Sequence, residues 1–151
     1  MESFSAGFVP LIIIGALVAF VLFWSLIVTL VSRLSGWQRL ATDYEAVDEP
    51  SGTTFGWQSL RFGSFSNYSR VINITPSSEG LHLQPILMYR MGHKPLLIPW
   101  DAIEFKQVET IGFIWWCSAE IAPKYGGKPT KVTFHRKNVI TALQKYSGST
   151  Q

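Results

Sequence analysis

The sequence predicts one membrane-spanning helix followed by a mainly-β domain that ends in a helix. Three observations support this: an uncharged apolar run near the N-terminus, a series of short apolar runs separated by turn residues, and a final stretch with helical periodicity. Of the 151 residues, 47% are hydrophobic and only 15% are charged, against a usual charged share of about a quarter. This composition excludes a disordered chain, a collagen-like chain and a highly charged nucleic-acid tail.

The first apolar run predicts a single-pass anchor within residues 1–35. The run of residues 8–31 begins with Phe8, contains Trp24 and ends with Val31, and no charged residue interrupts it. As a helix it extends ~36 Å, which is enough to cross a hydrocarbon core of ~30 Å. The alternative is a cleavable signal peptide. The length of the run, the lack of a basic region before it and the lack of a small-x-small cleavage pattern after it favour the anchor.

One face of the predicted span carries small residues. At 100° per residue they fall within an arc of ~120°: Gly15, Ala19, Ser25 and Thr29. Small side chains let a second helix approach closely, so this face is a candidate helix-packing surface. The alternative is a lipid-solvated anchor in which the small residues are incidental.

Basic residues near the span predict its orientation. Arg33 and Arg39 follow the span closely, and no Lys or Arg precedes it. The positive-inside rule then places the N-terminus outside and the C-terminal domain in the cytoplasm.

Residues 36–54 predict a short helix and a linker. Apolar residues at 37, 40, 41 and 44 have helical spacing and share one face. Trp37 and Tyr44, with Arg33 before them, suit a membrane interface, where an amphipathic ring lies at headgroup level. The short helix therefore either lies on the membrane or packs on the domain beyond it. The composition of residues 47–54 is that of a linker.

Residues 55–146 predict a β domain that ends in a helix. Seven runs read as strands: 56–62, 69–75, 81–87, 96–100, 102–109, 115–122 and 130–135. From residue 136 to 146 the period becomes helical, and residues 147–151 form a polar tail. Seven short strands followed by one amphipathic helix is the order of a pleckstrin-homology-like (PH-like) barrel, which the last helix caps. A different β-sandwich with a C-terminal helix is the alternative.

Three segments of the chain resemble a known group of proteins. They are residues 36–44, 79–83 and 92–103. In these segments the chain resembles small bacterial membrane proteins that have one N-terminal helix and a PH-like or GRAM-like domain. The resemblance specifies the structural scaffold rather than a reaction, and it implies no catalytic residues. We expect the chain to lie in the inner membrane of a bacterial cell. A shared fold is by itself weak support for any particular function.

No catalytic, cofactor or metal site is predicted. The three histidines, His82, His93 and His135, lack the spacing of metal ligands and are predicted to be surface residues. The single cysteine, Cys117, shares a strand face with Trp115 and is predicted to be buried and inert. The alternative is an enzyme with an unrecognised site around Cys117 and His135.

Basic residues are concentrated in the C-terminal third. Residues 106–151 contain seven basic and two acidic side chains, and Lys124, Lys128 and Lys131 surround one predicted hairpin. Each basic residue near an anionic leaflet gains ~1 kcal/mol, so these lysines are candidate contacts to anionic lipid. The alternative is a solvated basic rim. Nucleic acid is not expected, because no aromatic residues are interleaved with the lysines.

The most apolar run outside the anchor is residues 111–116. Within it, Phe113, Trp115 and Trp116 place large side chains on both faces of a strand. Such a strand is either covered by another element or contacts a partner. The leading hypothesis is therefore a non-enzymatic, membrane-anchored binding module, an accessory or scaffold subunit of a membrane protein complex. An anionic-lipid sensor on a membrane anchor is the alternative.

The predicted orientation has a direct test. Protease added outside intact cells or spheroplasts is expected to leave residues 55–146 uncut, because the positive-inside rule keeps this domain in the cytoplasm. Immunoblotting against the domain, with and without lysis, measures this. Cleavage at residues 125–128 without lysis would instead place the domain outside.

Overall fold

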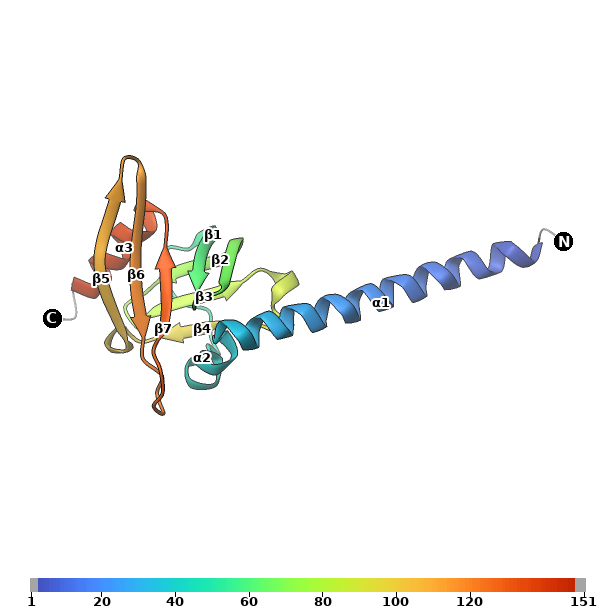
Figure 1. Ribbon diagram of the computed structural model, residues 1–151, viewed down its shortest axis with the longest axis horizontal. Helices are drawn as coiled ribbons and strands as arrows, with labels where there is room; N and C mark the ends of the chain where they lie inside the picture. Colours follow the sequence, from blue (N-terminus) through green and yellow to red (C-terminus); the bar gives the residue numbers. More distant parts are fainter. Residues whose placement is uncertain (1–2, 149–151) are drawn as a thin grey trace.

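The computed structural model describes residues 3–148, and their side chains from residue 7 onward. A long helix, α1 (Ser3–Ser35), extends away from a β domain that contains all the other elements (Figure 1). The β domain consists of a curled, seven-stranded antiparallel sheet and a C-terminal helix, α3 (Lys137–Ser147). The predicted fold class, one transmembrane-length helix followed by a mainly-β PH-like barrel of about seven strands and a capping helix, is confirmed, and the sheet is a curled half-barrel.

The strands form one continuous sheet with the order β4-β3-β2-β1-β7-β6-β5. Their bounds are β1 (Phe55–Phe62), β2 (Ser66–Pro76), β3 (Leu81–Pro85), β4 (Leu96–Ile98), β5 (Ile103–Ile111), β6 (Ile114–Ile121) and β7 (Thr130–Phe134). Two short 3₁₀ helices, η1 (Leu87–Tyr89) and η2 (Trp100–Ala102), flank β4. The chain turns between β5 and β6 at Gly112, where φ is +60°. The two strands extend to residues 111 and 114, so this hairpin is longer than the predicted strands 102–109 and 115–122 indicate.

The helix α3 closes the core between the two halves of the sheet. One face of α3 is buried, as its helical periodicity predicts: Val139, Ile140 and Leu143. At the end of α3, Tyr146 stacks on Trp100 with ring planes 3° apart and ring centroids 6.0 Å apart. The capping helix therefore packs into the core and contacts β2 and β6, one strand from each half of the sheet.

A second helix, α2 (Trp37–Tyr44), belongs to the core of the β domain. Gly36, with φ of +84°, allows the sharp turn between α1 and α2. Trp37 is fully buried, and its indole Nε1 donates a hydrogen bond to the Lys94 carbonyl at 2.8 Å. The prediction of Trp37 as a membrane-interface anchor is therefore wrong. Of the two alternatives for this helix, packing on the domain is the one observed.

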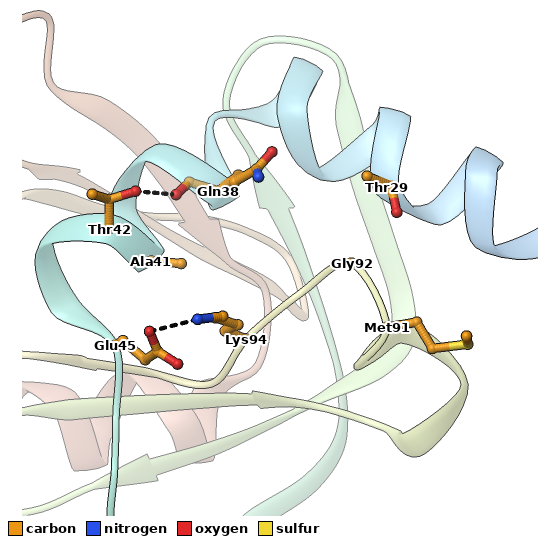
Figure 2. Close-up of a pocket in the computed structure, with 8 residues that line it drawn as sticks. All are labelled: Thr29, Gln38, Ala41, Thr42, Glu45, Met91, Gly92 and Lys94. Carbon is orange, nitrogen blue, oxygen red and sulfur yellow. Dashed lines mark hydrogen bonds and ion pairs between the residues drawn. The ribbon is translucent and has the colours of Figure 1, made fainter.

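The C-terminal part of α1 packs against η1 and the loop that follows it. Trp24 Nε1 donates to the Met88 carbonyl at 3.2 Å, and Gly92 lies against the backbone of Thr29 (Figure 2). Ser25 also contacts this loop, through a 3.4 Å hydrogen bond to the Met91 sulfur. The predicted helix-packing face is thus divided. Ser25 and Thr29 contact the chain's own β domain, whereas Gly15 and Ala19 stay exposed.

The segment of residues 47–54 covers the outer face of β2 and β3. Thr54 Oγ1 and Thr75 Oγ1 are 2.8 Å apart, and Gly52 lies so close that a Cβ there would be 2.6 Å from the Pro76 carbonyl oxygen. This cover buries His82 on β3. The prediction of His82 as a surface histidine is therefore wrong, because strand alternation does not reveal a linker that folds back over the sheet.

The close approach of Gly92 to α1 gives a stability prediction. A Cβ at residue 92 would lie 2.9 Å from the backbone N and Cα of Thr29. We expect Gly92→Ala to lower the free energy of unfolding by ~1–3 kcal/mol, because either the loop or α1 must move. Thermal unfolding of the full chain in detergent measures this.

The matched control for that experiment is Gly56→Ala. A Cβ at residue 56 meets only the Asn73 side chain, at an ordinary 3.6 Å. Equal melting temperatures for the two variants would show that the contact between the loop and α1 does not form in solution.

Candidate functional site

An open groove lies where the β5–β6 hairpin, the start of β1 and the start of α3 meet. Its volume is about 780 Å³. The residues that line it are Phe55, Phe113, Trp115, His135, Arg136, Lys137, Asn138 and Thr141. Phe113 is fully exposed at the tip of the hairpin, and Ile111 and Ile114 beside it are also exposed. β5, β6 and α3 are on the side of the β domain farthest from α1 (Figure 1).

Two of the three predicted partner-contact residues lie in this groove. Phe113 and Trp115 line it, and Lys137 Nζ lies 4.9 Å from the centre of the Trp115 ring, in a cation–π contact. Trp116 is on the other face of β6, where its Nε1 donates to Glu109 Oε2 at 2.6 Å. The alternation of strand side chains correctly separates Trp115 from Trp116.

Pairing along β1 explains why the groove stays open. Only Leu60, Arg61 and Phe62 of β1 pair with β7, so the first half of β1 diverges from that neighbour. The same half contains an irregular register with β2, and Trp57 there has a positive φ of 54° and is largely exposed. Sequence reasoning missed Trp57, because neither the register shift nor the outward turn of its ring has a local sequence signal.

The three candidate lipid-contact lysines do not form one cluster. Lys128 and Lys131 line a pocket together with Arg33 and Arg39. Lys124 is not among the residues that line this pocket. Its backbone N–H donates to Asp43 Oδ2 at 2.9 Å, and its Nζ lies 5.8 Å from the centre of the Tyr125 ring.

The other predicted interface residues also divide between two places. Arg33 lines the basic pocket and donates from Nε to Gln38 Oε1 at 3.1 Å. Tyr44 instead donates its hydroxyl to the Ala122 carbonyl at 2.8 Å, which attaches the end of α2 to the β domain.

A third hollow lies between α1, α2 and the loop after η1, and Figure 2 shows it from the side. Its volume is about 390 Å³. Lys94 Nζ and Glu45 Oε2 point toward each other across it and form a 2.8 Å ion pair between largely exposed groups. Exposed pairs of this kind contribute little, typically less than ~1 kcal/mol. This hollow contains no further charged side chain among its described lining residues, and it marks the junction of α1 with the β domain.

A buried polar network lies beneath that junction. Tyr68 OH is 3.1 Å from Ser35 Oγ and 2.7 Å from His93 Nε2. Burial raises the pKa of Tyr68 to about 12 and lowers the pKa of His93 to about 4. Both groups are therefore neutral near pH 7. The prediction of His93 as a surface histidine is wrong, because the Trp37 ring packs over it with centroids 5.4 Å apart.

Cys117 lacks the surroundings of a reactive thiol. Cys117 is buried, as predicted, and burial raises the pKa of its thiol. A reactive thiol needs a lowered pKa and access to substrate. His135 is exposed, as predicted, and lines the groove instead.

Residues 3–148 contain no group of three or more His, Cys, Asp or Glu side chains that could hold a metal ion. Comparison with known proteins adds no assignment: the chain matches no family model, and no curated protein matches it.

The burial of His93 predicts a pH-dependent stability. The pKa of His93 is about 4 in the folded chain and about 6.5 in an unfolded one. Between these values the unfolded state binds a proton that the folded state does not, so stability falls as the pH falls from about 6.5 toward about 4. The loss is on the order of 3 kcal/mol at most.

The variant His93→Gln isolates this contribution, since glutamine retains a polar partner for Tyr68 but does not titrate. We expect its melting temperature to fall less than that of the original chain between pH 7.5 and pH 5. The other titrating groups are common to both proteins and cancel in the comparison. Parallel pH profiles would contradict the burial of a neutral His93.

Proposed function

We propose that this protein is a non-enzymatic, single-pass membrane-anchored binding module, an accessory subunit that recruits a partner protein at the groove beside Phe113. The proposal rests on two exposed apolar features at opposite ends of the molecule. One is α1, which needs a lipid environment, and the other is the groove, which needs a partner. We further propose that the anchor lies in a bacterial inner membrane with the β domain in the cytoplasm.

The character of α1 supports anchoring. Residues Gly7–Ser35 are long and apolar enough to span a membrane, with a mean hydropathy of 2.9 over an 18-residue stretch, and residues 7–23 are all exposed. An exposed apolar helix of this length cannot be covered by the β domain, which contacts only its C-terminal part. Lipid is the solvent that satisfies such a helix.

The observation that carries the binding proposal is the exposed apolar tip of the β5–β6 hairpin. Phe113 has no side-chain burial at all, and Ile111 and Ile114 are each at least 60% exposed. Contiguous exposed apolar side chains at the mouth of a groove are typical of an interaction site. Residues of the β5–β6 hairpin and the start of α3 line the groove, and these elements are on the side of the β domain farthest from α1 (Figure 1), so its occupant comes from the aqueous phase rather than from lipid.

The groove also indicates the chemistry of the partner. Arg136 and Lys137 border the apolar surface, and no acidic side chain is among the described residues that line it. A protein segment that combines an apolar side chain with neighbouring carboxylates matches this surface. The apolar part provides affinity, and the charges favour association and orientation.

Site-specific photo-crosslinking tests this function. We expect a photoreactive phenylalanine analogue at residue 113 of the full chain, in native membranes, to crosslink one dominant protein. The control is the same analogue at Tyr125, which is also largely exposed but lies on the β6–β7 loop. It is expected to give no such product.

The variant Phe113→Ser provides the second arm. Residue 113 makes no buried contact, so the variant is expected to keep its melting temperature while its complex in mild detergent shrinks to the size of the free chain. Equal crosslinking from both positions, or an unchanged complex in the variant, would refute the proposal.

A further inference from the structure

Four basic side chains from separate parts of the chain surround one pocket at the C-terminal end of α1. Arg33 lies in the last turn of α1 and Arg39 lies in α2, while Lys128 precedes β7 and Lys131 lies within it. The pocket has a volume of about 440 Å³, and none of the described residues that line it is acidic. Like charges that converge without a compensating carboxylate favour an anionic ligand.

The same pocket contains a buried hydroxyl that lacks a partner. Thr130 is only 4% exposed, and within residues 7–148 its Oγ1 has no hydrogen-bond partner. A Cβ placed on Gly36 would lie 3.6 Å from this oxygen, so the hydroxyl lies beside the turn between α1 and α2. A buried polar group without a partner costs about 1–3 kcal/mol. A ligand oxygen bound in the pocket would remove this penalty.

Contacts along α1 fix the depth of the pocket relative to a membrane. The apolar stretch of α1 ends at Val31, and Arg33 follows ~3 Å further along the helix axis. η1 and the loop after it lie deeper, because the Met88 carbonyl of η1 accepts the hydrogen bond of Trp24 and the Met91 sulfur of the loop accepts that of Ser25. Figure 1 shows this loop beside α1, reaching farther toward the N-terminus than the strands do.

Exposed large apolar side chains gather at this depth, and the one exposed charged side chain among residues 87–92, Arg90, donates from Nε to the Pro85 carbonyl at 3.3 Å. The apolar side chains are Phe65, Leu87, Met88 and Met91. In Figure 2 Met91 projects away from the junction, on the side where α1 continues toward its N-terminus. In this arrangement the apolar side chains contact the acyl chains of the lipid, and the basic residues contact the headgroups. The pocket therefore opens at headgroup level when α1 spans a membrane.

We propose that this pocket binds the phosphate group of an anionic phospholipid headgroup. Arg33 and Arg39 provide guanidinium forks that suit phosphate oxygens, and Lys128 and Lys131 add point charges. Thr130 Oγ1 donates its free hydrogen bond to the bound phosphate. The site differs from the hairpin cluster predicted from sequence, because the two arginines replace Lys124. The inference rests on the proposed membrane anchoring of α1 but involves neither the groove nor a partner protein.

Native mass spectrometry of the full chain in detergent tests the proposal. The probes are phosphatidylglycerol, which is anionic, and phosphatidylcholine, which is zwitterionic. We expect one phosphatidylglycerol to bind at least tenfold more tightly than phosphatidylcholine. Arg39→Gln is expected to weaken phosphatidylglycerol binding about fivefold, which corresponds to the loss of one basic contact. The matched control Lys124→Gln removes the same charge outside the pocket and is expected to change binding less than twofold.

Thr130→Val separates binding from structure. If the hydroxyl serves the ligand, this variant keeps or gains thermal stability without lipid and loses phosphatidylglycerol affinity roughly tenfold, because a hydrogen bond to a charged group is lost. A purely structural hydroxyl predicts the reverse, a loss of stability with unchanged affinity.

Three outcomes would overturn the proposal. Equal affinity for the two lipids would remove the headgroup preference, and equal effects of Arg39→Gln and Lys124→Gln would remove the site. Binding of inorganic phosphate with the affinity of phosphatidylglycerol and the same dependence on Arg39 would assign the pocket to free phosphate rather than to lipid. None of these readouts depends on a partner protein, so they are independent of the crosslinking at residue 113.

Discussion

The burial of Trp37 is the constraint on which the arrangement of anchor and domain depends. The indole packs among Phe62, Tyr68 and His93, while its Nε1 bonds to the Lys94 carbonyl. A fully buried tryptophan is among the largest single apolar contributions that a core can contain. Because Trp37 follows α1 by only one glycine, this burial attaches α1 directly to the β domain. The hydrogen bonds from Ser35 and Trp24 then fix its direction.

The architecture was predictable because its signals are local. Strand runs, turn residues and the helical period of residues 137–147 depend on neighbours in the sequence, and each gave the correct element type. The separation of Trp115 from Trp116 and the burial of Cys117 follow from the same two-residue period. These features needed no knowledge of which strands pair.

What the sequence could not predict depends on contacts between distant segments. His82 is buried because residues 47–54 fold over its strand, and His93 because Trp37 packs against it. The basic pocket is a further example. Its arginines and lysines lie about ninety positions apart in the sequence, so a scan for local charge clusters grouped Lys124 with the lysines and missed the arginines. Trp37 itself is of a residue type that is common at membrane interfaces, but its position in the fold is in the core.

The two candidate binding surfaces lie at different distances from α1. The basic pocket is formed partly by α1 itself, whereas the groove beside Phe113 is formed by elements on the far side of the sheet. The groove and the pocket share no residue, and β6 and β7 run between them. The proposed lipid ligand and the proposed protein partner could therefore bind to one chain at the same time, because the sheet separates the two binding surfaces.

The continuity from α1 through Gly36 into the buried α2 has a mechanical consequence. A domain tethered by a flexible linker moves independently of its anchor, but here the residues with linker composition come after α2. α1 and the β domain therefore rotate together as one rigid unit. A tilt or rotation of α1, imposed by a neighbouring helix against Gly15 and Ala19 or by a change in bilayer thickness, would swing the distant hairpin through an arc set by the width of the domain.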